Sequence, residues 1–356
     1  MAPAVRFWDG GGADALASNP LNWSDDTAPT AQDTIVFNAT STKSITVDSA
    51  FPATIANLRI ESGYDGTNTV PTTSLTLHRP LTITNSFIQA GGAIELTFGN
   101  FTIGSGADFE WLAGKFIARY NNELVISSGA TVNVRTAALH GLGISSAPVD
   151  PVILNNFGTI NIHDNATVAA GGSGATLYVR QGGQLNFLGS GIALDAPAAF
   201  FSFVIDNQGT ITKSGLDADI LLRNVHVTNI GTLNVNNGNL RIQGRGVGQG
   251  NVATIAAGAA LTLEGGIVDF SGFGLGGVFD LNGFQVTGAG TLVIDGANAE
   301  VRHAGTSSVE NLILKRGIVS GTGTLTINRE MYWSGGTMIG ASDARTTIGA
   351  NAILYV

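Results

Sequence analysis

The segment Gly209-Thr210-Ile211-Thr212 returns as Gly231-Thr232-Leu233-Asn234, 22 residues further along the chain. The same phrase, glycine and threonine followed by Ile or Leu, begins at three more glycines: Gly158, Gly290 and Gly323. A repeat of roughly 20 residues that carries several short strands is typical of a β-solenoid. In that architecture stacked coils bury a column of apolar side chains that no single coil can bury alone.

Between these glycines the chain forms short runs in which apolar and polar residues alternate, such as Thr232-Leu233-Asn234-Val235 and Ala260-Leu261-Thr262-Leu263. Alternation with a period of two predicts β-strands that present one face to a core. Helical periodicity is nearly missing, so the sequence predicts an all-β protein. The side chains expected to face inward are Leu233, Val235, Leu261, Leu263, Leu292, Ile294, Leu325 and Ile327.

A β-sandwich and a closed barrel are the competing all-β architectures, and a sandwich has a similar density of strands. Neither gives a reason for the recurring Gly-Thr-Leu phrase. The repeat therefore favours a parallel β-helix. Because crossovers between parallel strands are almost always right-handed, we expect right-handed winding.

The composition agrees with a folded, glycine-rich repeat protein. Glycine accounts for 49 of the 356 residues, while 44% of the residues are hydrophobic and 12% are charged. A disordered chain has the opposite balance, and the glycines lack the period of three found in collagen. There is no cysteine, which excludes disulfide bonds and thiolate metal sites.

The first 70 residues differ from the rest of the chain. They contain Trp8 and Trp23, two of the four tryptophans, and five of the nine prolines lie at or before Pro71. The end of a solenoid needs a cap that covers the core of the first coil and blocks edge pairing. We therefore expect a divergent N-terminal cap at residues 1–70 that merges into the first coils, followed by a β-solenoid over residues 71–356.

Charge and hydropathy restrict the partners. The net charge is −9 and the basic residues are scattered, whereas a nucleic-acid-binding face is basic. No window of about 18 apolar residues exists, so we expect no membrane span. The N-terminus lacks the basic and apolar regions of a signal peptide. The chain is accordingly either cytoplasmic or a mature form with an added Met1.

Several segments resemble those of a known class of repeat proteins. At the N-terminus these are Phe7-Trp8-Asp9-Gly10-Gly11-Gly12 and Asn22-Trp23-Ser24, and near the C-terminus Tyr332-Trp333-Ser334-Gly335-Gly336-Thr337-Met338. They are similar to segments of secreted bacterial surface proteins with autotransporter-passenger-like or adhesin-like β-solenoid repeats. The resemblance covers most of the chain and is weakest at about 135–205. It implies a β-solenoid and an extracellular or cell-surface location, but it carries over no active site.

The sequence offers no clear catalytic, cofactor or metal motif. Its histidines never form an HxH or HExxH pattern, and each is predicted to be a strand or turn residue: His78, His140, His163, His226 and His303. The glycine-rich run from Gly244 to Gly250 is followed by no helical pattern, so we interpret it as a long turn and not as a phosphate-binding loop. We expect no catalysis, no cofactor and no bound metal.

Two acidic clusters remain as candidates for chemistry. Asp217 and Asp219 are expected to share one strand face, and Asp25-Asp26 could converge with Asp33. Paired carboxylates serve glycosidases or bind Ca²⁺, but we interpret these as solvated turn residues. The phenylalanines that could stack on sugars are interpreted as core ladders: Phe200, Phe201, Phe203, Phe270, Phe273, Phe279 and Phe284.

Three classes of function follow from this sequence. The first is a non-catalytic structural or adhesive surface element, either self-associating or part of a larger surface protein, with surface glycans as a second class of partner. The second is a carbohydrate-active β-helix enzyme, a polysaccharide lyase or glycosidase, which turnover of acidic polysaccharides would reveal. The third is a phage tailspike or fibre segment, which would form SDS-resistant trimers.

The two ends of the chain lead to a prediction about assembly. The N-terminal end has a cap, whereas Ala352-Ile353-Leu354-Tyr355-Val356 is strand-like, with no Pro, Lys or helix after it. An unprotected strand edge is a template for another strand. Either further coils follow, or copies associate head to tail into a fibre. The residues predicted to lie at the joint are Trp8, Trp23, Ile353, Leu354, Tyr355 and Val356.

Overall fold

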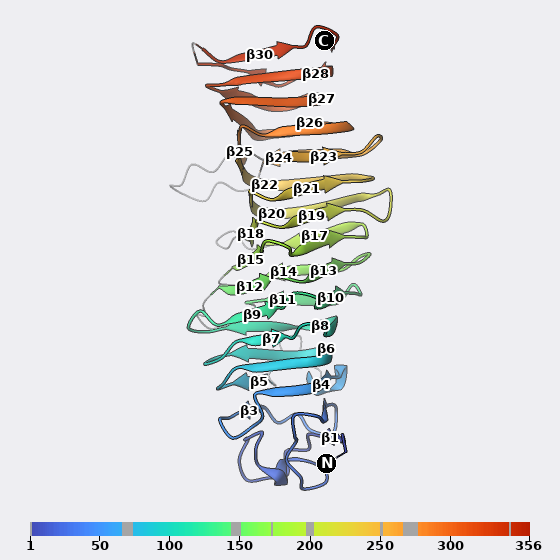
Figure 1. Cartoon of the computed structure of the whole chain (residues 1–356), viewed down its shortest axis with the longest axis vertical. Helices are drawn as coiled ribbons and strands as arrows, with labels where there is room; N and C mark the ends of the chain where they lie inside the picture. The colour runs from blue at the N-terminus through green and yellow to red at the C-terminus, as the bar shows by residue number, and fades with distance from the viewer. Residues whose placement is uncertain are drawn as a thin grey trace. The chain divides into compact units, whose positions relative to one another are not determined.

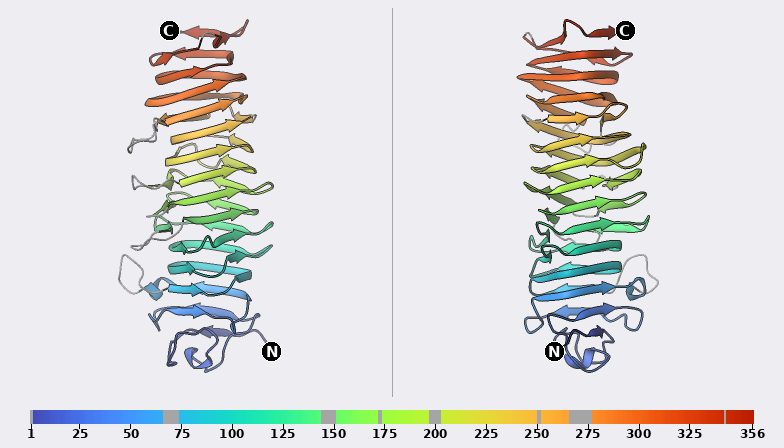
Figure 2. Two further views of the ribbon diagram at one scale, coloured as in Figure 1. Left: turned by 90° about the vertical axis from the view of Figure 1, so that its left-hand side faces the viewer. Right: turned by 45° about the vertical axis from the view of Figure 1, so that its right-hand side comes forward.

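The computed structural model describes residues 2–65, 74–143, 151–171, 174–196, 203–249, 252–265, 277–341 and 343–356. In these residues the secondary structure is β-strand, apart from the short 3-10 turns η1 (Pro20–Asn22) and η2 (Ser62–Asp65). The chain divides into unit 1, Met1–Leu177, and unit 2, Tyr178–Val356. Within each unit the strands lie in successive layers (Figure 1 and Figure 2).

Unit 1 is a stack of parallel strands, each hydrogen-bonded to a strand one coil further along the chain. Thr34 pairs with Asn57 in this way, and Thr131 pairs with Thr159. The strands are β1 (Val5–Phe7), β2 (Thr34–Phe37), β3 (Ile45–Val47), β4 (Thr54–Ile60), β5 (Ser74–Leu77), β6 (Leu81–Leu96), β7 (Phe101–Ile103), β8 (Asp108–Ala118), β9 (Glu123–Ile126), β10 (Thr131–Val134), β11 (Leu139–Leu142), β12 (Val152–Asn156), β13 (Thr159–Ile162), β14 (Thr167–Ala170) and β15 (Ala175–Val179), which ends in unit 2.

Unit 2 has the same construction. Ile211 pairs with Leu233 and Leu233 pairs with Ala253, so one coil takes about the 22 or 20 residues that the repeated phrase predicts. The strands are β16 (Gln184–Phe187), β17 (Gly191–Asp195), β18 (Phe203–Asn207), β19 (Thr210–Lys213), β20 (Asp219–Asn229), β21 (Thr232–Val235), β22 (Asn239–Gln249), β23 (Val252–Ile255), β24 (Ala260–Gly265), β25 (Gly277–Asn282), β26 (Gln285–Ala304), β27 (Thr306–Gly321), β28 (Thr324–Trp333), β29 (Thr337–Met338), β30 (Arg345–Ile348) and β31 (Ile353–Tyr355). The predicted fold class, an all-β parallel β-helix, is confirmed.

The predicted core is also confirmed. Along unit 2, Leu240, Leu261 and Leu292 occupy one register position in three consecutive coils, and Leu312 continues the column. All four side chains are buried. The eight side chains that the alternation places inward are likewise buried, so the strand register inferred from the sequence is correct.

The repeated Gly-Thr phrase has a steric cause. A Cβ built on Gly231 would lie 2.3 Å from the carbonyl oxygen of Gly209, and one on Gly323 would lie 2.1 Å from that of Gly305. The glycine of the phrase thus sits where one coil turns directly against the backbone of the coil before it. No other residue fits this approach without moving the backbone, which explains why the phrase recurs at each such turn.

The prediction of a long turn for the glycine-rich run is wrong for the residues that the structure describes. Gly244 to Gln249 form the second half of strand β22, while Gly250 lies outside the described residues. Gly246 pairs with Val227 in the preceding coil and with Phe279 in the following one, and both of these side chains are buried. In this half of β22, glycine therefore occupies the positions that face the core. The strand keeps its period of two, but its inward positions carry no apolar side chains.

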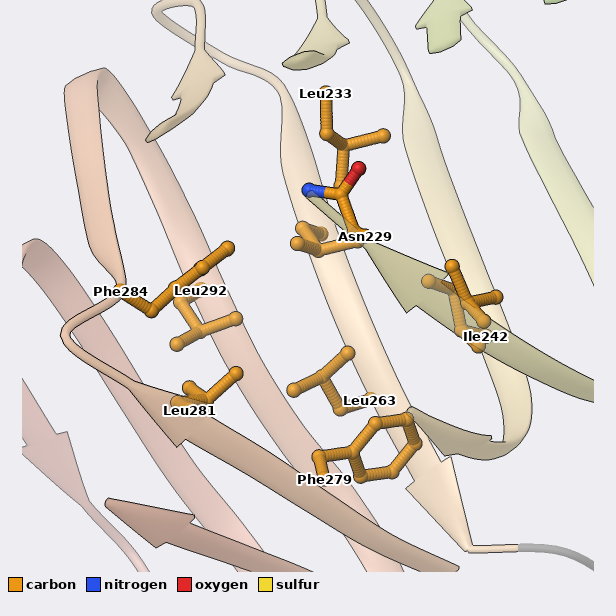
Figure 3. Close-up of a pocket in the computed structure, with 10 residues that line it drawn as sticks. Asn229, Leu233, Ile242, Leu263, Phe279, Leu281, Phe284 and Leu292 are labelled. Atoms are coloured by element: carbon orange, nitrogen blue, oxygen red, sulfur yellow. The ribbon is translucent and has the colours of Figure 1, made fainter. Parts of the chain in front are cut away.

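A small internal cavity lies beside this strand in unit 2. Its volume is about 50 Å³, and Figure 3 shows side chains of neighbouring coils, including Leu263, Phe279 and Leu292, around it. Phe279 and Phe284 line the cavity and are buried, and Phe203 is buried as well. These three phenylalanines are core residues, as predicted. Four others lie outside the described residues: Phe200, Phe201, Phe270 and Phe273.

Candidate functional site

The N-terminal part of unit 1 is held by an aromatic cluster around Trp8 and Trp23. The two indole rings meet edge to face, with 5.4 Å between their centroids, and Phe37 contacts both. Each indole N–H donates to a backbone carbonyl, that of Trp8 to Lys43 at 3.0 Å and that of Trp23 to Ala17 at 2.9 Å. The cluster is therefore both apolar and satisfied in its hydrogen bonds, which suits a buried core.

The two tryptophans, which we predicted to lie at the joint between copies, are buried within this segment. Both side chains are 0% exposed, so in this conformation neither presents a surface to another molecule. They stabilise the N-terminal segment from within. The exposed large apolar side chains of this segment are Val5 and Phe7 on β1, Leu16, and Leu21 in η1. Sequence reasoning missed them because an isolated apolar residue in an irregular segment gives no periodic signal.

Asp33, one of the acids considered for chemistry, has a structural role. Its carboxylate accepts hydrogen bonds from the backbone N–H groups of Ala4 and Thr30, at 2.8 Å each, and from the Arg6 guanidinium. Arg6 also pairs with Asp25, whereas Asp26 occupies a turn with a positive φ of 50°. The structure thus brings Asp25 and Asp33 together around one buried arginine.

The Asp33 network predicts a loss of stability in acid. Burial alone would raise the pKa of Asp33, but the hydrogen bonds from Thr30, Ala4 and Arg6 outweigh it and hold the pKa below its usual value. A carboxyl whose pKa is lower in the folded state stabilises the fold above its unfolded pKa of about 3.9, and this contribution disappears as the pH falls through the folded pKa. We expect Asp33→Asn to flatten the dependence of unfolding free energy on pH between about 5 and 2. Denaturant unfolding at several pH values measures this slope, and an unchanged slope would contradict the assignment.

The C-terminal coil of unit 2 ends in an open strand edge. Strand β28 pairs with β27 on one side and with β30 and β31 on the other. Within the described residues of unit 2, no strand pairs with the outer edges of β30 and β31. The rings of Tyr332 and Tyr355 stack at 4.3 Å between centroids, which holds β31 on β28.

The apolar column is uncovered at the same place. Met331 is 1% exposed, whereas its register partner Leu354 in the next coil is 43% exposed. Ile353, Tyr355 and Val356 are exposed as well. Of the six predicted interface residues, the four at the C-terminus are therefore all exposed, and we name this end of the coil the terminal coil surface: Ile353, Leu354, Tyr355 and Val356. Within strand β31 the side chain of Leu354 continues the position of the buried Met331, while Ile353 and Tyr355 point to the opposite face.

The second acidic cluster does not converge as expected. Asp219 is the first residue of β20, while Asp217 lies in the bend before it, so they do not share a strand face. The Asp219 carboxylate lies 3.7 Å from the Arg241 guanidinium. The carboxylates of Asp217 and Asp219 both interact electrostatically with the buried ammonium group of Lys213. Burial lowers the pKa of Lys213, and the two acids partly oppose this. Asp217 and Asp219 thus supply negative charge near a buried lysine.

The histidines are scattered over strands and turns, as predicted. His140, on β11 of unit 1, is fully buried with its ring nitrogens 2.9 Å and 3.2 Å from the carbonyl oxygens of Trp111 and Thr167. His78 and His163 lie in turns, and His226 lies on β20. His303, on β26, differs from His140 because its buried Nδ1 has no hydrogen-bond partner among the described residues. Among the residues that the structure describes, no group of three His, Asp or Glu side chains could hold a metal ion.

Comparisons with known proteins add no relative. No protein-family model, no curated protein and no solved structure matches this chain. The described part of the chain contains no helix long and apolar enough to cross a membrane.

Proposed function

We propose that this protein is a non-catalytic structural β-solenoid of the cell surface or extracellular space, whose terminal coil surface joins the N-terminal segment of another copy. The observation that carries the proposal is the contrast between Leu354 and Met331. The same register position is buried in one coil and open in the next. A further coil would bury Leu354 just as β31 helps to bury Met331.

The backbone supports the same assembly. The outer edges of β30 and β31 carry N–H and C=O groups that a parallel strand can pair with, at the usual spacing of about 4.8 Å. Main-chain hydrogen bonds would give such a joint affinity, and apolar contacts would give it register. The receiving surface on the N-terminal segment would be formed by the exposed side chains Val5, Phe7 and Leu21. A head-to-tail contact that does not close into a ring grows a fibre.

The location and the absence of catalysis belong to the same proposal. An extracellular or cell-surface setting is supported by the resemblance of the N-terminal and C-terminal segments to secreted repeat proteins. A structural role is supported by the carboxylates, since Asp33 and Asp219 are engaged with basic side chains. Coils of a longer surface protein would cover the terminal coil surface in the same way as a second copy, and surface glycans remain a second class of partner.

The proposal predicts that Leu354→Lys weakens association. A lysine there would put a charge against the apolar cross-section of an added coil, as the lysines of natural edge strands do. We expect the concentration at which complexes appear in analytical ultracentrifugation to rise at least tenfold, which corresponds to about 1.4 kcal/mol. The matched control is Ile230→Lys, which makes the same change at an exposed apolar residue in a turn of unit 2.

Two results would contradict the proposal. One is a wild-type protein that stays monomeric up to the highest concentration tested. The other is an equal loss of association in the Leu354→Lys and Ile230→Lys variants, because association would then come from general surface hydrophobicity and not from the terminal coil surface.

A further inference from the structure

A second cavity in unit 2 lies among the last coils and has a buried imidazole in its wall. Its volume is about 180 Å³, and it is lined by apolar side chains together with His303, Arg345 and Thr346. The apolar lining comes from Val319, Met338, Ile339 and Ala344. For comparison, a cavity of about 150 Å³ is large enough to bind benzene.

The cavity exists because glycine follows His303 in the stack. His303 pairs with Gly321 in the next coil, and a Cβ on Gly321 would lie only 2.0 Å from the His303 carbonyl oxygen. The N–H groups of Ile339 and Ala341 donate to Val319 and Gly321, which sets Gly340 beside Gly321 in the coil after that. Two successive positions above the imidazole therefore carry no side chain.

The basic groups of this cavity have no partner among the residues that the structure describes. His303 is 4% exposed, and its Nδ1 makes no hydrogen bond there. A buried polar atom without a partner costs about 1–3 kcal/mol, so a site that leaves one open is suited to a ligand that satisfies it. Arg345, at the rim, forms no ion pair within the described part of unit 2.

We propose that this cavity binds a small organic carboxylate with an apolar body, such as an aromatic monoacid. The carboxylate would accept hydrogen bonds from the Arg345 guanidinium, whose fork of N–H groups matches two carboxylate oxygens, and from Nδ1–H of His303. The apolar body would lie against Val319 and Met338. A single guanidinium beside a neutral imidazole favours a monoanion over a phosphate, for which several cations usually converge.

A neutral imidazole is the form that this site provides. Burial lowers the pKa of His303, so the ring is uncharged near neutral pH and can carry its proton on Nδ1. The geometry of the cavity, and not this titration, carries the proposal. Because Arg345 lies on β30, whose outer edge belongs to the proposed joint, ligand binding is measured on the unassociated protein, and the Leu354→Lys variant tests association separately.

The test is a titration with sodium benzoate, followed by the ¹⁵N resonances of the histidine rings at a protein concentration below any association. We expect one of the five histidines, absent in His303→Leu, to shift saturably with a Kd on the order of 1 mM. Benzyl alcohol, which has the same ring and no charge, should bind at least tenfold more weakly, because it lacks the charge-assisted hydrogen bonds.

Variants decide between this site and unspecific binding. Arg345→Gln should weaken benzoate binding at least tenfold, whereas Arg329→Gln, which removes another exposed arginine of unit 2, should leave it unchanged. His303→Leu keeps a similar volume and should lose binding, as read by the ligand's own signals. Absence of a saturable shift at His303, equal affinity for benzyl alcohol, or equal effects of the two arginine variants would overturn the proposal.

Discussion

Replacing Trp23 with alanine should lower the free energy of unfolding of unit 1 by about 3–5 kcal/mol. The side chain is completely buried, contacts the rings of Trp8, Phe37 and Phe51, and donates its indole N–H to Ala17. The substitution removes this apolar contact area and leaves a cavity in the N-terminal segment. Denaturant unfolding followed by far-ultraviolet circular dichroism measures the change.

Trp333 provides the matched comparison for Trp23. Trp333 is partly exposed, whereas the other three tryptophans are buried. Its indole N–H lies 3.4 Å from the Gly336 carbonyl oxygen, which is a long hydrogen bond. Trp333→Ala should therefore cost clearly less than Trp23→Ala. Equal losses for the two variants would mean that the aromatic cluster does not hold the N-terminal segment as described.

Leu261→Ala should destabilise unit 2 by about 2–5 kcal/mol. Leu261 lies between Leu240 and Leu292 in the inward column, and its side chain is 2% exposed. It also lines the internal cavity of about 50 Å³, so the substitution enlarges a space that the neighbouring coils have not closed. The cost of such a change rises with the volume of the cavity that remains, which favours the upper part of the range.

The control for this column is Leu216→Ala, the same chemical change at a leucine that is 50% exposed. A surface substitution of this kind typically changes stability by no more than about 0.5 kcal/mol. Urea unfolding of both variants under one set of conditions compares them directly. A small effect of Leu261→Ala would show that the columns of unit 2 are not the main source of its stability.

The core is predictable from the sequence because its signal is periodic. Alternating runs such as Thr232-Leu233-Asn234-Val235 place every second side chain inward, and the recurring Gly-Thr phrase marks turns where only glycine fits against the preceding coil. Both signals are local and repeat from coil to coil. Fold class and inward register therefore follow from the amino-acid pattern alone.

Features without periodic apolar residues are not predictable in this way. The run from Gly244 to Gln249 has the composition of a turn because glycine occupies the inward register of β22, where an apolar side chain would have marked a strand. The burial of Trp8 and Trp23 depends on contacts between irregular segments. The cavity at His303 depends on two glycines in later coils, Gly321 and Gly340. These glycines are distant from His303 in the sequence, so the sequence pattern does not reveal that the three residues lie together.

Electron microscopy of the purified chain at micromolar concentration tests the central proposal most directly. We expect filaments in which the terminal coil surface of one copy meets the N-terminal segment of the next, with strand spacing near 4.8 Å maintained across the joint. The Leu354→Lys variant should form few or none of them. Separate particles with an ordered, uncovered terminal coil surface at every concentration would contradict the account, as would trimers joined side by side with both ends free.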